Sequence, residues 1–228
     1  VKTLVAGVKA QMKANNVQVF MARGVVKGKD AQGFAVQAGE ELLHGSRLLI
    51  ATGSSAAVPP IEGVKEGLDS GFVLTNREIL DLAERPQRLC VIGGGVIGLE
   101  LASYFNSIGT EVSVVEMLDH IAGETDQDLV ALLKADLEKK GIRFELNARV
   151  TAVTPQGVRY EQAGEDKLIE ADKVLLSIGR RANTRDLGLD SLNVLVERGA
   201  MVTDERMRTN VPDAYAAGDV NGRSMLAH

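Results

Sequence analysis

Hydrophobic positions along residues 88–116 switch from one spacing to another and back. An apolar run at 88–92 is followed by apolar residues at helical spacing, and a second apolar run occupies 111–116. Short apolar runs are typical of buried strands, whereas repeats at i, i+3 and i+4 are typical of an amphipathic helix. The segment therefore predicts a strand–helix–strand unit of about thirty residues, the size of one βαβ unit with parallel strands.

The flanking patterns predict further elements of both kinds. Before the unit they predict an N-terminal amphipathic helix carrying Leu4, Val8 and Met12, a strand at 17–22, short antiparallel strands within 24–50, a buried strand at 47–51 and a short helix at 76–84. After it they predict a helix from Thr125 to Lys140, a strand at 142–146, an antiparallel meander within 150–169 and a buried strand at 172–179. Thr125 with Asp128 three positions later resembles a capping box. The order of elements predicts an α/β chain.

Two predicted buried strands share the same surroundings. The strands at 48–51 and 174–178 each follow a β-meander and each end next to a glycine. This approximate internal symmetry indicates two copies of one nucleotide-binding arrangement. The proline-containing link at 58–63 blocks both helix and strand ladder, so we expect a boundary or crossover there.

Composition narrows the classes of function. The 228 residues are 45% hydrophobic and 25% charged, with a net charge of −5, which is typical of one large or two small globular domains. Basic residues are scattered, so no nucleic-acid partner is expected. No apolar run is long enough for a membrane span and no signal peptide pattern opens the chain, so we expect a cytoplasmic protein without a membrane partner.

Cysteine and histidine usage gives no metal or disulfide prediction. Cys90 is the only cysteine, which excludes a disulfide framework within one chain, and it lies inside a predicted strand. We interpret it as a small core residue rather than a nucleophile. His44, His120 and His228 show no metal-ligand spacing and are interpreted as surface or loop residues.

Candidate chemistry begins with the glycines between the first strand and the helix. Gly93, Gly95 and Gly98 have the spacing of a dinucleotide fingerprint. The first glycine allows a tight turn, the second allows a pyrophosphate to approach the backbone, and the third allows the helix to pack closely on the sheet. Val96 and Ile97 open the helix, where free N–H groups favour phosphate. The alternative is a glycine-rich turn that binds no ligand.

Glu116 ends the second strand, about twenty residues after the fingerprint. An acid at this position accepts hydrogen bonds from adenosine ribose hydroxyls and repels a 2′-phosphate. No arginine stands beside it. The residues therefore predict NAD(H) rather than NADP(H) as the dinucleotide.

The same motifs, taken together with others, resemble a known family. The matching segments are 51–54, 93–100, 114–116, 177–181, 209–212, 216–220 and 225–228. Their order and spacing resemble the flavoprotein disulfide reductases with two dinucleotide-binding domains. The resemblance implies a Rossmann-like NAD(P)-binding domain at 72–195, a parallel sheet with a β-meander. It would be inserted in a partial FAD-binding domain formed by 1–71 and a return segment at 196–228.

The resemblance also implies roles for single residues. The residues matching FAD contacts are Gly24, Thr52, Gly53, Asp219, Met225, Leu226 and Ala227. Gly179 matches the nicotinamide-side turn of the NAD domain, and Glu100 matches a glutamate near the flavin and nicotinamide rings. The residues alone leave simpler alternatives open. Asp219 could cap a helix, Glu100 could be a surface helix residue, and Arg180 with Arg181 could be a solvated pair.

The implied activity is hydride transfer between NAD and FAD, coupled to a lipoyl-type dithiol in a homodimeric parent. Related NADH oxidases and mercuric reductases share the framework, so they remain alternatives, as does a non-catalytic NAD-binding module. The family's first glycine fingerprint, its CxxxxC redox pair and its dimerisation domain with a His–Glu pair do not occur among the 228 residues. We therefore expect an internal fragment that is inactive alone and less stable outside its NAD domain.

Overall fold

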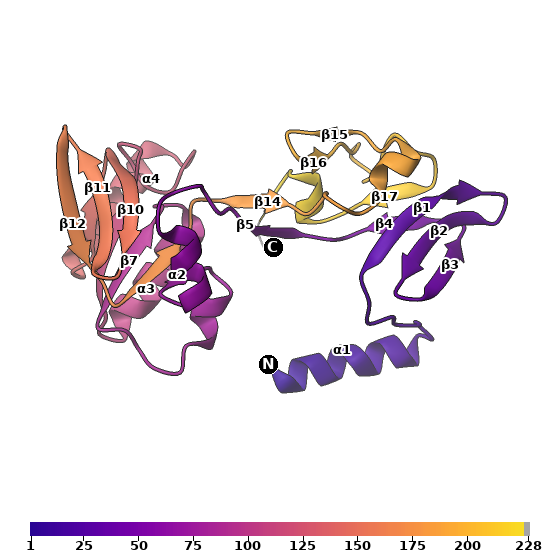
Figure 1. Ribbon diagram of the computed structural model, residues 1–228, viewed down its shortest axis with the longest axis horizontal. Coiled ribbons are helices and arrows are strands. Elements are labelled where there is room, and N and C mark those ends of the chain that lie inside the picture. Colours follow the sequence, from indigo (N-terminus) through magenta and orange to yellow (C-terminus); the bar gives the residue numbers. More distant parts are fainter. Residues whose placement is uncertain (226–228) are drawn as a thin grey trace. The chain divides into compact units, whose positions relative to one another are not determined.

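Two compact units make up the chain, whose computed structural model describes residues 1–225 (Figure 1). The central unit is Ser55–Arg181. The flanking unit combines Val1–Ser54 with the chain from Ala182 onward. The prediction of an NAD domain at 72–195 between two FAD-domain segments stays a prediction, because a division by contacts assigns no ligand.

A five-stranded parallel sheet forms the core of the central unit. Its strands lie in the order β6 (Val73–Leu74), β13 (Lys173–Leu176), β7 (Arg88–Ile92), β8 (Glu111–Val115) and β9 (Arg143–Glu145). Every neighbouring pair in this sheet is parallel. Parallel sheets are covered on both faces, so their strands are apolar throughout. The four residues from Leu89 to Ile92 are accordingly all buried.

One face of the sheet is covered by helices. α3 (Val96–Ser107) buries Leu99, Ala102 and Phe105 in a cluster that includes Val112 and Val114 of β8. α4 (Gln127–Lys139) adds its two buried residues to the same cluster. The unit also contains α2 (Val64–Ser70) and a 3₁₀ turn, η1 (Glu78–Asp81), which replaces most of the short helix predicted at 76–84. The predicted βαβ unit is confirmed.

The start of α4 differs from the prediction. Asp126, not Thr125, is the N-cap, and its carboxylate accepts from the backbone N–H of Asp128 at 3.0 Å. The Thr125 hydroxyl instead donates to the carbonyl of Ala122 at 2.8 Å. The predicted capping box was therefore wrong by one position, because two adjacent residues both had side chains able to cap a helix.

A three-stranded antiparallel meander covers the other face of the sheet. It consists of β10 (Ala148–Thr154), β11 (Gly157–Gln162) and β12 (Glu165–Glu170). Val153, Val158 and Tyr160 of the meander share a buried cluster with Cys90 and Val174 of the sheet. The predicted meander is confirmed, and Cys90 is a core residue.

The flanking unit repeats part of this plan. A meander of β1 (Gly24–Asp30), β2 (Gly33–Ala38) and β3 (Glu41–Gly45) precedes β4 (Leu48–Ile50), which pairs in parallel with β17 (Ala214–Ala216). Its remaining short elements are η2 (Leu189–Leu192), β15 (Val196–Glu197), β16 (Ala200–Met201) and η3 (Asp219–Asn221). The buried cluster here contains Ile50, Leu189, Met201, Ala216 and Val220. The meander–strand–glycine symmetry read from the sequence is confirmed.

The first twenty-two residues depart from the predicted picture. α1 (Lys2–Ala14) is a helix as predicted, but none of its residues is buried, and Leu4 is 77% exposed. The strand predicted at 17–22 is wrong, because no strand forms there among the described residues. A strand requires a partner ladder, and an apolar alternation without a neighbour does not supply one.

The central unit is joined to the rest of the chain by two strands that pair with each other. These are β5 (Ser54–Ala56) and β14 (Arg180–Ala182). Among residues 1–225, no helix is long and apolar enough to cross a membrane.

Candidate functional site: a strand-end crevice in the central unit

The order in which the chain adds strands to the central sheet reverses between β7 and β13. From β7 the chain proceeds through α3 to β8 and then β9 on one side, whereas β13 lies on the other side of β7. Ligands of open parallel sheets bind at such a switch point, outside the carboxyl ends of the two strands. Here the ends of β7 and β13 lead into two loop segments, 93–95 and 177–179. The two strand ends are linked by a hydrogen bond, in which the Ser177 N–H donates to the Ile92 carbonyl at 2.8 Å.

Gly93 forms the turn out of β7. Its backbone has φ +104°, a conformation that L side chains rarely adopt, and its N–H donates to the Val115 carbonyl at 2.9 Å. A Cβ at this position would collide with the carbonyl oxygen of Ser177. Glycine is therefore required by both the dihedral angle and the adjacent strand end.

Gly95 and Gly98 differ in what surrounds them. A Cβ on Gly98 would lie 2.5 Å from the Gly93 carbonyl oxygen and 3.2 Å from the Ser177 hydroxyl oxygen. A Cβ on Gly95 would meet nothing within 4 Å. Gly98 thus permits close packing of α3, whereas Gly95, the N-cap of α3, leaves open space at the helix N-terminus. That open space at a positive helix end fits a pyrophosphate.

The Glu116 carboxylate is held against the glycine turn. One oxygen, Oε2, accepts from the Gly94 N–H at 2.6 Å, and the other, Oε1, accepts from the Leu118 N–H at 2.9 Å. A carboxylate offers about four acceptor positions, so two remain for sugar hydroxyls. The residues present therefore fit the adenosine ribose and pyrophosphate of a dinucleotide. The part played by Gly94 was missed, although the run of three glycines signalled a close backbone approach.

A loop at 117–123, which the sequence reasoning also missed, adjoins this turn. Ala122 N–H donates to the Gly94 carbonyl at 2.7 Å, and Ile121 Cγ2 lies 3.2 Å from where a Gly94 Cβ would be. His120 Nδ1 lies 2.6 Å from Asp119 Oδ1. This contact raises the pKa of His120, with further contributions from the Gly123 backbone and the Glu116 charge, and it lowers the pKa of Asp119.

The remaining candidate NAD residues lie around the same strand ends. Val96 is exposed and Ile97 half-buried in the first turn of α3, and Glu100 is exposed on the same helix. Gly179 is exposed beyond β13, and a Cβ added there would meet nothing within 4 Å, while its carbonyl accepts from Ala57 N–H at 2.9 Å. The structure thus brings Gly179 to the switch point, whereas the described contacts assign Glu100 no role.

The candidate FAD residues gather partly at a second pair of strand ends, in the flanking unit. Thr52 and Gly53 follow β4, and Asp219 follows β17. Asn183 bonds both residues of the first turn: its carbonyl accepts from the Thr52 hydroxyl at 2.7 Å, and its backbone N–H donates to the Gly53 carbonyl at 2.9 Å. Ser54, the next residue, donates its hydroxyl to the Asp219 carboxylate. The three predicted residues are therefore close to one another.

The positions of the other predicted FAD residues neither support nor oppose their predicted role. Gly24 begins β1 opposite Ala38. Met225 is half-buried and is the last described residue, while Leu226 and Ala227 lie outside the described residues. Within the described chain no group of three or more His, Cys, Asp or Glu side chains could hold a metal ion.

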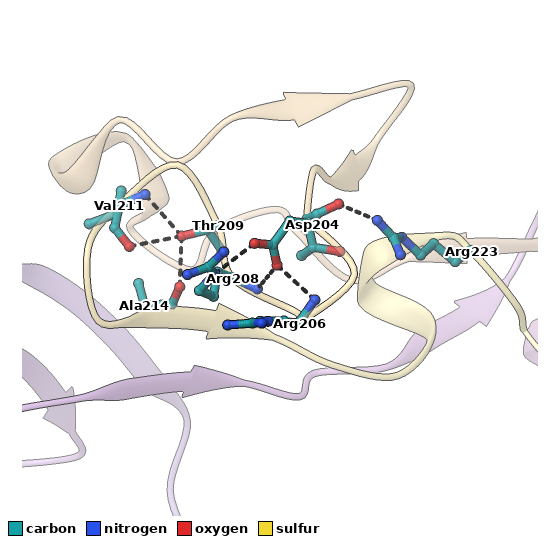
Figure 2. A network of polar contacts seen from close by, with 8 residues as sticks. Asp204, Arg206, Arg208, Thr209, Val211, Ala214 and Arg223 are labelled. Atoms are coloured by element: carbon teal, nitrogen blue, oxygen red, sulfur yellow. Dashed lines mark hydrogen bonds and ion pairs between the residues drawn. The ribbon is translucent and has the colours of Figure 1, made fainter.

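The flanking unit also contains a hollow of about 590 Å³, which is lined by a network of polar contacts and not by the residues that follow β4 and β17. It is lined by residues from 202–204 and 208–213. Figure 2 shows Asp204 accepting from the backbone N–H groups of Arg206 and Arg208, both at 2.9 Å, and from Arg208 Nε at 2.6 Å. Thr209 similarly donates to the Ala214 carbonyl. These hydrogen bonds hold the loop in its conformation.

Sheet order, glycine turn and strand-terminal acid together are typical of the Rossmann-like α/β folds that bind dinucleotides. The family model described as pyridine nucleotide-disulphide oxidoreductase matches residues 1–228. The chain belongs to this family.

Individual relatives agree with that assignment. The chain is 41% identical to a dihydrolipoyl dehydrogenase of Acholeplasma laidlawii, over 100% of this chain and 66% of the relative. It is 34% identical to the human mitochondrial dihydrolipoyl dehydrogenase, over 100% of this chain and 46% of the relative.

Solved structures give the same picture. LpdA from Mycobacterium tuberculosis superposes with a TM-score of 0.86 at 29% identity, over 99% of this chain and 50% of that one. The copper(II) complex of the HOCl-induced flavoprotein disulfide reductase RclA from Escherichia coli gives 0.83 at 25% identity, over 99% and 52%. The chain therefore spans about half to two-thirds of the proteins it matches.

Proposed function

We propose that the central unit binds NAD(H) at the crevice between β7 and β13. The observation that supports this most directly is the Glu116 carboxylate, which two backbone N–H groups hold beside an open glycine turn. In this arrangement Glu116 would hold the adenosine ribose, and Gly95 with the first turn of α3 would receive the pyrophosphate. Gly179 would border the nicotinamide end.

The flanking unit would contribute to FAD binding in the longer protein. Thr52 and Gly53 would approach the pyrophosphate and ribityl region, and Asp219 would hold a ribityl hydroxyl, with Gly24, Met225, Leu226 and Ala227 at further contacts. Bound NADH and FAD would supply hydride chemistry, which side chains alone cannot provide. Glu100 would lie near the nicotinamide ring.

Disulfide chemistry would belong to the longer protein rather than to these residues. Cys90 is the chain's single cysteine, it is 0% exposed, and burial raises the pKa of its thiol to about 12. A thiol in that setting supplies no thiolate near neutral pH. We propose a dihydrolipoyl-type dithiol as the parent's substrate, since relatives with that name match the whole chain. We propose a homodimer as the parent's assembly. The present chain would bind NAD(H) without turnover.

A titration tests this proposal. The chain has no tryptophan, so NADH fluorescence can be followed with little protein background. We expect saturable enhancement with the original chain and loss of preference for NADH over NADPH in Glu116→Arg. Glu84→Arg, at an exposed acid four residues before the amino end of β7, is the matched control and should retain the preference. A folded chain without measurable NADH affinity would contradict the proposal.

A second measurement addresses the redox part. Purified chain should show no NADH-dependent turnover with lipoamide, with or without added FAD. Measurable turnover would show that a dithiol pair is not needed and would contradict the division of roles proposed above.

A further inference from the structure

His120 occupies the middle of a loop that is attached at both ends to the nucleotide crevice. Two residues before it, the Leu118 N–H donates to Glu116 Oε1 at 2.9 Å. Two residues after it, the Ala122 N–H donates to the Gly94 carbonyl at 2.7 Å. The imidazole is therefore carried by the same backbone that positions the ribose-binding acid and the glycine turn.

We propose that His120 is a specificity-determining residue whose imidazolium form partly offsets the Glu116 carboxylate, so that the discrimination between NADH and NADPH depends on pH. This inference rests on the proposed NAD(H) site and adds regulation to it.

Charge accounts for the direction of the effect. A 2′-phosphate carries up to two negative charges where NADH has a hydroxyl, so Glu116 disfavours NADPH by like-charge repulsion. A protonated His120 places a compensating positive charge in the same loop. The neutral ring at higher pH provides none, and the discrimination against NADPH should then be greatest.

The groups facing His120 favour its protonated form. The contact with Asp119 Oδ1, at 2.6 Å, is the largest influence on the pKa of His120, and burial, which opposes it, is the second. The charge of Asp119, a hydrogen bond with the Gly123 backbone and the charge of Glu116 follow, and all three raise the pKa. The net effect raises the pKa of His120 above its ordinary value of 6.5. A neutral imidazole has one N–H donor, so only the imidazolium can donate on both sides. The side chain is 28% exposed and can titrate with solvent.

The test is the ratio of the NADPH and NADH dissociation constants, measured on the full chain at about pH 6 and about pH 9. In the original chain the ratio should fall toward low pH by about 1.5- to fivefold more than in His120→Gln, the range typical of one exposed charge pair. The 2′-phosphate itself titrates in both proteins, so its contribution cancels in this comparison. His44→Gln, which removes a histidine next to Asp30 in the flanking unit, should behave as the original chain does.

Asp119→Asn provides a second variant that keeps the imidazole. It removes the main stabilisation of the imidazolium and also one negative charge of the loop. The midpoint of the pH dependence should therefore shift to lower pH, and the ratio should fall at both pH limits. Ring NMR titrations offer an independent readout. By reciprocal linkage, bound NADPH should raise the pKa of His120 more than bound NADH does.

The outcomes separate the two proposals. NADH binding with equal pH dependence in the original chain and in His120→Gln would overturn the role of His120 and leave the NAD(H) site standing. Absence of NADH binding at every pH, in folded protein, would overturn the site and this inference with it.

Discussion

Glu116 Oε2 accepts a hydrogen bond from the backbone N–H of Gly94 at 2.6 Å, across 22 positions of sequence. The bond ties the end of β8 to the turn after β7. It means that the acid is already oriented before a nucleotide arrives, so little side-chain entropy remains to be lost on binding.

Replacing Glu116 by glutamine, which has nearly the same shape but no charge, should weaken NADH binding. In Glu116→Gln we expect affinity to fall about tenfold or more, because hydrogen bonds to a charged group contribute about 1.5–3 kcal/mol. Calorimetric titration measures the change. Glu84→Gln is the control, and equal affinities of both variants would contradict the assignment of Glu116.

Substitution of Gly95 and of Gly98 should affect different properties, NADH affinity in the first case and stability in the second. Gly98→Ala places a methyl group 2.5 Å from the Gly93 carbonyl, so unfolding free energy should fall by about 1–3 kcal/mol. Gly95→Val has open space and φ −74°, so its stability should change little while NADH affinity is lost. Denaturant melts together with NADH titration distinguish these results. A stable Gly98 variant, or a Gly95 variant with unchanged affinity, would show that the glycines have other roles.

Cys90 should react only when the central unit unfolds. Its thiol is fully buried and its pKa is raised to about 12, so an aromatic disulfide reagent should leave it unlabelled in native protein. Labelling in increasing urea should follow the loss of circular dichroism. Rapid labelling without denaturant would mean that the packing between β7 and the meander opens locally in the native protein.

The Arg88–Asp172 pair should contribute to acid sensitivity. Asp172 accepts from the Arg88 backbone N–H at 2.8 Å and from its guanidinium at 2.9 Å, and these contacts lower the pKa of Asp172. A lowered folded-state pKa gives stability that is present above the ordinary value of 3.8 and is lost as the pH falls through the folded-state pKa.

Asp172→Asn should therefore be less stable than the original chain near neutral pH and should lose less stability on acidification from about pH 5 to about pH 3. Thermal melts across that range measure it. Glu170→Gln removes a more exposed carboxylate that accepts from the guanidinium of Arg88, and should show a smaller change. Parallel pH profiles for Asp172→Asn and the original chain would contradict this account.

Amide exchange should be fastest in α1. None of its residues is buried, whereas β7 is buried along Leu89–Ile92. Helices of this length are marginal in water without packing. We expect the α1 amides to exchange well before those of β7, and equal protection would be evidence against the lower stability predicted for the flanking segments.

Much of the fold and the centre of the candidate site could be predicted from the sequence because their signals are local. The glycines at 93, 95 and 98, the apolar runs on either side and the terminal Glu116 all occur within thirty residues. What was missed depends on contacts between distant residues. The Gly94–Glu116 bond and the packing of the 117–123 loop exist only once β7 and β8 are adjacent. Likewise, residues 17–22 alternate like a strand but have no ladder to join within the described chain.

The pairing of β5 with β14 means that the two chain ends of Ser55–Arg181 leave from one place. A continuous polypeptide with adjacent ends can be moved as a cassette, because its removal opens only a short gap in the host and leaves its five-stranded sheet uncut. Residues 55–181 thus form a transplantable module that could be grafted into an exposed turn of an unrelated scaffold.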